Sequence, residues 1–117
     1  MAEPLKIDSE IASGFRVFRL SGPLTMADLF EFQDTARSDS EHPILIDLAG
    51  VPYMDSAGLG AILGILASCQ RTGRKFGITG ASERIQTLFK VSHVDGLIPS
   101  FDSLEAAASE IAKSASA

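Results

Sequence analysis

The pattern of hydrophobic and polar positions begins with two short alternating stretches. In residues 5–11, the apolar residues Leu5, Ile7 and Ile11 stand among polar neighbours, which is typical of a half-buried strand. A short Ala-Ser-Gly turn separates this stretch from a second candidate strand over residues 15–21. The spacing therefore predicts that the chain opens with a β-hairpin.

After the hairpin, the spacing becomes that of alternating helices and strands. Residues 25–37 predict a helix that Thr25 caps, because Met26, Leu29, Phe30 and Phe32 recur at helical intervals. Residues 42–50 form a near-continuous aliphatic run, typical of a central strand covered on both faces. The remaining expected elements are a helix over 56–72, a strand over 75–79, a helix over 82–91, an edge strand over 97–101 and an Asp102-capped helix over 102–113.

The resulting order, ββαβαβαβα, predicts the fold class. Strands separated by helices require crossover connections, so we expect an α/β domain with a mixed sheet and helices packed against it. The buried stripe of the helix over 56–72 is expected to consist of Leu59, Ile62, Leu63 and Leu66.

Length and composition are consistent with one such domain. The chain has 117 residues, of which 45% are hydrophobic and 21% charged, so we expect residues 1–117 to form a single domain. The longest nearly apolar run, 57–69, has 13 residues, whereas a membrane span needs about 20. The N-terminus also lacks a signal-peptide pattern. We therefore expect a soluble, cytoplasmic protein with no membrane insertion.

Charge and cysteine content exclude several kinds of partner. The net charge of −5 and the lack of a basic run argue against a nucleic-acid surface. The single cysteine, Cys69, fits a reducing compartment and is expected to be buried as a small hydrophobe. Two histidines and one cysteine offer no metal-ligand spacing, so we expect no metal site.

The stretch "PYMDSAGLGAILG" over residues 52–64 holds the candidate chemistry. Its glycines superficially match a dinucleotide-binding fingerprint, but they lie too far beyond the preceding strand. The acidic ribose-binding residue expected about 20 positions later is also missing. We expect no cofactor, and we expect Gly58, Gly60 and Gly64 to let the helix backbone lie close to the sheet.

Ser56 in this stretch does not fit a hydrolase. "MDSAG" has half of a nucleophile elbow, but Met54 stands where the first glycine belongs. The only candidate bases, His42 and His93, lie in stretches that suggest no site. No catalytic residue is predicted.

Two interpretations of the role of Ser56 remain open. In the first, Asp55 or Ser56 simply caps the helix by accepting a hydrogen bond from a free backbone amide. In the second, Ser56 accepts a phosphate, because a helix N-terminus stabilises an anion by up to about 2 kcal/mol. The added charge would leave the fold intact and repel a partner that docks there.

The stretch "ILIDLAGVPYMDSAGLGAILG", residues 44–64, resembles the core of the STAS domain of bacterial anti-sigma factor antagonists. Asp47 and Leu48 match the end of the family's aliphatic strand. The residues that match the motif opening the helix are Asp55, Ser56, Ala57, Gly58, Leu59 and Gly60. The similarity extends to residues 18–24, 74–99 and the closing helix, and so covers nearly the whole chain.

The resemblance implies a non-catalytic regulator. It implies that Ser56 is phosphorylated by an anti-sigma factor that is itself a serine kinase, which the unphosphorylated antagonist binds to free a sigma factor. A phosphatase would restore the binding. The docking surface would be the loop 50–56 with the exposed side of the next helix, and Ala61 and Ile65 belong either to that surface or to the core. We expect a monomer or a weak dimer.

One departure from the pattern leaves an alternative. Many antagonists have Gly-Glu-Leu-Asp after the second strand, where this chain has Gly-Pro-Leu followed by Thr25. That form also resembles STAS domains of anion transporters and other adaptors. The alternative function is therefore a non-catalytic scaffold or adaptor subunit of a transporter or signalling assembly, with Ser56 only a helix cap.

Overall fold

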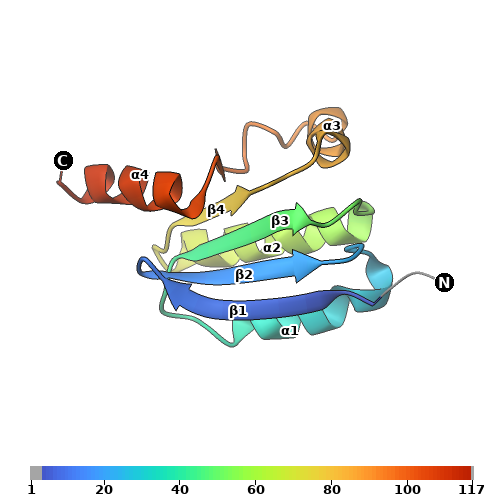
Figure 1. Cartoon of the computed structure of the whole chain (residues 1–117), viewed down its shortest axis with the longest axis horizontal. Coiled ribbons are helices and arrows are strands. Elements are labelled where there is room, and N and C mark those ends of the chain that lie inside the picture. Colours follow the sequence, from blue (N-terminus) through green and yellow to red (C-terminus); the bar gives the residue numbers. More distant parts are fainter. Residues whose placement is uncertain (1–3, 117) are drawn as a thin grey trace.

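The computed structural model describes residues 4–116, with side chains described for 4–110, and its elements follow the expected order (Figure 1). Strands β1 (Lys6–Ala12) and β2 (Phe15–Ser21) form the predicted hairpin. A short 3-10 helix, η1 (Met26–Asp28), leads directly into α1 (Leu29–Arg37). The other elements are β3 (Ile44–Gly50), α2 (Ser56–Arg71), β4 (Phe76–Thr79), α3 (Glu83–Val91), β5 (Ser100–Phe101) and α4 (Leu104–Ser116).

The strands of the described chain form a mixed sheet in the order β1-β2-β3-β4-β5. Strand β1 is antiparallel to β2, whereas the β2–β3, β3–β4 and β4–β5 pairs are parallel. Parallel neighbours need crossover connections, and α1, α2 and α3 provide connections between successive strands. The predicted α/β mixed sheet is confirmed.

Two apolar clusters cover the two faces of the sheet. On one face, α1, α2 and α3 pack against alternate residues of the central strands, and α1 and α2 lie behind the strands in Figure 1. On the other face, α4 packs through Ala107 against Phe15, Val17 and Leu45. Residues of the larger cluster include Phe18, Ile46, Leu48, Phe32, Ile62 and Phe89.

The caps of two helices differ from the prediction. Thr25 stands at the start of η1, but its side chain makes no capping hydrogen bond. At α4, the amide of Ala106 donates to Oγ of Ser103 at 3.0 Å, so Ser103 and not Asp102 caps the helix. The helix begins at Leu104, and the residue directly before it is the one whose side chain can reach the free amides.

The buried face of α2 is wider than the sequence predicts. Leu59, Ile62 and Leu66 are buried as expected, whereas Leu63 is only partly buried. Ala61 is 1% exposed and Ile65 7% exposed, so both belong to the core and not to a docking surface. The reason is that α1 packs beside α2 and covers a second stripe of this helix.

Cys69 lies on the same buried face and is fully enclosed, as expected. Burial raises the pKa of its thiol, because the charged thiolate is disfavoured away from water. Cys69 is therefore an inert core residue.

Over residues 4–116, none of the helices combines the length and the apolar character that crossing a membrane requires.

Candidate functional site

The loops that follow β2 and β3 run side by side and create the site. Leu24 and Met54 form an isolated parallel bridge. The amide of Leu24 donates to the carbonyl of Tyr53, and the amide of Asp55 donates to the carbonyl of Leu24, both at 3.2 Å. These hydrogen bonds extend the parallel pairing of β2 and β3 beyond the sheet. As a result, the start of η1 lies against the start of α2.

The carboxylate of Asp55 connects the two helix starts. Its Oδ1 accepts from the amide of Gly58 at 2.9 Å, and its Oδ2 accepts from the amide of Met26 at 3.1 Å. These hydrogen bonds, that of Gly58 first, lower the pKa of Asp55 because they favour the ionised carboxylate. Asp55 therefore caps α2, and it also accepts from the amide at the start of η1, where the side chain of Thr25 makes no capping hydrogen bond.

Ser56 is the first residue of α2, and its side chain is exposed. Among the side chains of residues 4–110 and the described backbone, no group forms a hydrogen bond with its hydroxyl. The expectation that either Asp55 or Ser56 caps the helix is thus decided in favour of Asp55. Ser56 is left at a helix N-terminus, where free backbone amides favour an anion.

The three glycines of α2 have different surroundings. A Cβ on Gly58 would overlap the carbonyl oxygen of Leu24, so this position accepts only glycine without a shift of the backbone. No atom lies within 4 Å of a Cβ built on Gly60 or Gly64. The expectation that all three bring the helix close to the sheet is therefore wrong. Gly58 alone permits a close approach, and its neighbour is the loop before η1.

Two of the four apolar side chains that predicted the first helix, Met26 and Phe30, are exposed, and Met26 lies beside Asp55. Met26 is 67% exposed and Phe30 is 73% exposed. The buried face of α1 instead carries Phe32 and Ala36. Phe30 precedes Phe32 by two positions on α1, so the two side chains lie on different faces of this helix, whereas Met26 belongs to the separate helix η1. An apolar residue on a second face of the helix is the sequence signal that indicates this exposed surface.

The other flank of the site carries a cation. The guanidinium of Arg84, from α3, lies 5.1 Å from the ring centroid of Tyr53 in the loop before α2. This contact connects α3 to the loop that presents Ser56. The exposed surface around Ser56 therefore combines apolar, acidic and basic groups within a few residues.

The structure does not bring a general base to Ser56. His42 lies before the start of β3, where its Nδ1 is 2.8 Å from Oδ2 of Asp39, whereas Ser56 follows the other end of that strand. His93 lies in the turn after α3, with a φ of 59°. Among the described side chains, no three His, Cys, Asp or Glu residues gather in a way that could hold a metal ion.

Comparisons with known proteins agree on one family. The STAS domain profile matches residues 6–107. An anti-sigma-B factor antagonist of Staphylococcus epidermidis is 32% identical over 97 residues, which cover 80% of this chain and 90% of that protein. The corresponding protein of Staphylococcus aureus is 31% identical over the same length.

Solved structures share the fold at lower sequence identity. The anti-sigma factor antagonist SpoIIAA in its unphosphorylated form is 17% identical, with a TM-score of 0.76 over 92% of this chain and 97% of that one. A STAS domain protein from Planctomyces limnophilus is also 17% identical, with a TM-score of 0.80 over 91% of this chain and 97% of that one. At this identity, the likeness establishes the arrangement of strands and helices.

Proposed function

The chain belongs to the STAS domain family, and we propose that it is an anti-sigma factor antagonist controlled by phosphorylation of Ser56. In this proposal, the unphosphorylated protein binds an anti-sigma factor that is a serine kinase, and so releases a sigma factor. The kinase phosphorylates Ser56, which ends the binding, and a phosphatase restores it. Antagonists of this kind are non-catalytic regulators.

The position of Ser56 is the observation that carries the proposal. Its hydroxyl is exposed and unpaired, while the neighbouring carboxylate of Asp55 already caps the helix. The fold therefore does not depend on this serine, and a kinase can reach it without local unfolding. The alternative in which Ser56 serves only as a cap loses its structural basis.

A phosphate on Ser56 would act on binding more than on folding. It would add about 1.5 to 2 negative charges at a helix N-terminus, which favours anions. The same charge would stand next to the ionised carboxylate of Asp55 on an exposed surface. Desolvating this doubly acidic site against a partner would cost several kcal/mol, so the complex would dissociate while the domain stays folded.

We place the docking surface on the loop 50–56 and on the exposed apolar pair Met26 and Phe30. Met26 is joined to the Ser56 site through the hydrogen bond of its amide with Asp55. Apolar side chains at the centre of an interface commonly supply most of the binding energy. The pair therefore replaces the buried residues Ala61 and Ile65 as the apolar contacts expected on this surface.

The remaining parts of the proposal concern the protein in the cell. We propose that residues 1–117 form one STAS domain that acts in the cytoplasm as a monomer or a weak dimer. Its partners would be the kinase and the phosphatase, without direct contact with nucleic acid and without a cofactor.

The test combines modification mapping with partner capture. Peptide mass spectrometry of the protein isolated from its own host should locate a phosphate on Ser56 that is absent from Ser56→Ala. Tagged wild-type protein and Ser56→Ala should retain a kinase-type ATPase, whereas Ser56→Asp should not. The matched control is Ser13→Asp, which adds the same charge in the exposed β1–β2 turn at the opposite end of β2. It should retain the ATPase.

Two results would contradict the proposal. If Ser56→Asp retained the ATPase as well as Ser13→Asp does, a charge at Ser56 would not be the switch. If the protein stayed unmodified across growth and stress conditions and co-purified with a membrane transporter or a multi-copy assembly, the adaptor function would replace the antagonist.

A further inference from the structure

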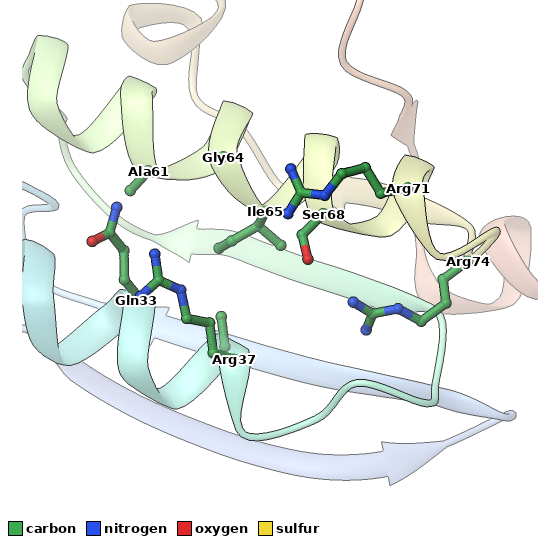
Figure 2. Close-up of a pocket in the computed structure, with 9 residues that line it drawn as sticks. Gln33, Arg37, Ala61, Gly64, Ile65, Ser68, Arg71 and Arg74 are labelled. Carbon is green, nitrogen blue, oxygen red and sulfur yellow. The ribbon is translucent and has the colours of Figure 1, made fainter.

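A groove of about 100 Å³ lies between α1 and α2, away from Ser56. Small residues of both helices, Ala36, Ala61 and Gly64, leave space there. Polar side chains surround that space, and Figure 2 shows them reaching toward it from α1, from α2 and from the segment after α2. These polar residues are Gln33, Arg37, Ser68, Arg71 and Arg74.

Three of the chain's ten cationic side chains meet at this one groove, although the net charge of the protein is −5. Arg74 is held in place, because its Nη1 donates to the carbonyls of Asp39 at 3.0 Å and His42 at 3.2 Å. Arg37 and Arg71 are exposed, and no described residue forms a hydrogen bond or an ion pair with either guanidinium. The groove therefore contains unpaired positive charge.

Helix ends do not account for this charge. Arg37 and Arg71 stand in the last turns of α1 and α2, where a cation offsets the helix dipole. Each helix C-terminus carries the equivalent of about half a negative charge, so three guanidinium groups exceed both ends together by about two charges. The nearby carboxylate of Asp39 is already paired with Arg16 at 2.9 Å.

We propose that this groove binds a small oxyanion, namely a phosphate group, either free or on a small organic molecule. Guanidinium groups bind phosphate oxygens through paired, charge-assisted hydrogen bonds. The Ser68 hydroxyl and the Gln33 amide add neutral donors on two sides of the groove. The lining holds no aromatic side chain to stack a nucleobase, so the phosphate group itself is the recognised part.

The groove is separate from the site of the proposed switch. Ser56 opens α2 and Arg71 ends it, so at a rise of 1.5 Å per residue the two ends lie about 22 Å apart. A phosphate group bound by Arg71 and Arg74 therefore lies far from the Ser56 hydroxyl, although the lining of the groove extends along α2 to Ala61. The inference stands whether or not Ser56 is phosphorylated.

The test is a titration of the ¹⁵N-labelled protein with inorganic phosphate at constant ionic strength, followed by amide chemical shifts. Amides of residues 33–37 and 64–74 should shift along a saturating curve. Arg71→Gln and Arg37→Gln should each weaken binding by about tenfold, the loss expected for one charge-assisted hydrogen bond. The matched control Lys75→Gln removes the same charge from an exposed residue outside the groove and should keep the wild-type affinity.

A second pair of variants blocks the groove without changing its charge. Gly64→Leu places a side chain in the open space of the groove and should abolish saturable binding. Gly60→Leu, also at an open position on α2 but outside the lining, should not. Both variants should remain folded, because both positions are exposed and a Cβ built there meets nothing outside its own helix.

Three results would overturn the inference. Shifts that grow without saturation, or that sodium chloride reproduces at equal ionic strength, would indicate charge screening only. If Arg71→Gln and Lys75→Gln lost phosphate affinity equally, the protein would attract the anion through its overall charge and not through a specific site. Equal binding of acetate would exclude phosphate recognition. In the supporting case, glycerol 3-phosphate binding more tightly than inorganic phosphate identifies an organic ester as the ligand, and the reverse order identifies free phosphate.

Discussion

The carboxylate of Asp55 accepts a hydrogen bond from the backbone amide of Met26 at 3.1 Å. Asp55 belongs to the loop before α2 and Met26 begins η1, and the same carboxylate also accepts from the amide of Gly58 in α2. One side chain thus holds the starts of two helices together. Because Asp55 provides the capping hydrogen bond, phosphorylation or substitution of Ser56 removes no contact on which the fold depends.

The first prediction separates these neighbours by stability. Asp55→Ala removes a helix cap and the partner of the Met26 amide, so the free energy of unfolding should fall by about 1–2 kcal/mol. Ser56→Ala removes no hydrogen bond and should change it by less than about 0.5 kcal/mol. Urea denaturation followed by circular dichroism measures both. Equal losses in the two variants would mean that Ser56 shares the capping.

The second prediction concerns the glycines of α2. Gly58→Ala forces a Cβ against the carbonyl of Leu24 and should cost about 1–3 kcal/mol, as overpacking does. Gly64→Ala meets no neighbour and should stabilise the helix by up to about 1 kcal/mol, and Gly60→Ala serves as a second example of an open position. Thermal and urea unfolding of the three variants provide the measurement. A destabilised Gly64→Ala would show that the space around α2 is not open.

The third prediction follows from the buried carboxylate of Asp39. Burial alone would raise its pKa, but hydrogen bonds from the amide of His42, the guanidinium of Arg16 and the amide of Glu41 hold that pKa well below its usual value. A carboxyl whose pKa is lower in the folded chain stabilises the fold above the unfolded value of about 3.9. This stabilisation is lost as the pH falls through that value toward the folded pKa.

Asp39→Asn tests this dependence. At pH 7, the variant should be less stable than wild type by about 1.5–3 kcal/mol, the contribution of hydrogen bonds to a charged group. The difference should shrink as the pH falls from about 5 to 2, because the unfolded wild-type chain then binds a proton at Asp39 that the folded chain, with its lower pKa, does not bind. Urea unfolding across this range measures it, with the exposed Asp34→Asn as the control. A difference independent of pH would exclude the carboxylate charge as its cause.

The fourth prediction rests on the proposed docking surface. Phe30→Ser should weaken binding of the captured ATPase by about tenfold or more, because it removes an exposed apolar anchor. Its free energy of unfolding should change by less than about 0.5 kcal/mol. Ile11→Ser, a control on β1 near the opposite end of the sheet, should keep the wild-type affinity. Titration calorimetry measures the affinity of each variant for the ATPase. Equal losses of affinity in the two variants would exclude a specific role for Phe30.

The sequence by itself determined the order of the elements and the motif that opens α2. Alternating and helical periodicities depend on which face of an element is buried, so the strands over 15–21 and 44–50 were predicted almost to the residue. The Asp-Ser-x-Gly-Leu-Gly pattern of residues 55–60 likewise marked the start of α2, which the structure places beside η1.

Only the tertiary structure decided how these parts meet. Which residue caps α2, which glycine is essential and whether Ile65 is buried all depend on the loop around Leu24 and on α1, which are distant in sequence from α2. The groove arises in the same way, because Arg37 comes to Arg71 and Arg74 only when α1 packs beside α2. The hydrophobic periodicity of a helix or strand indicates which of its faces is buried. It does not indicate which residues of other elements that face contacts, and the features above depend on those contacts.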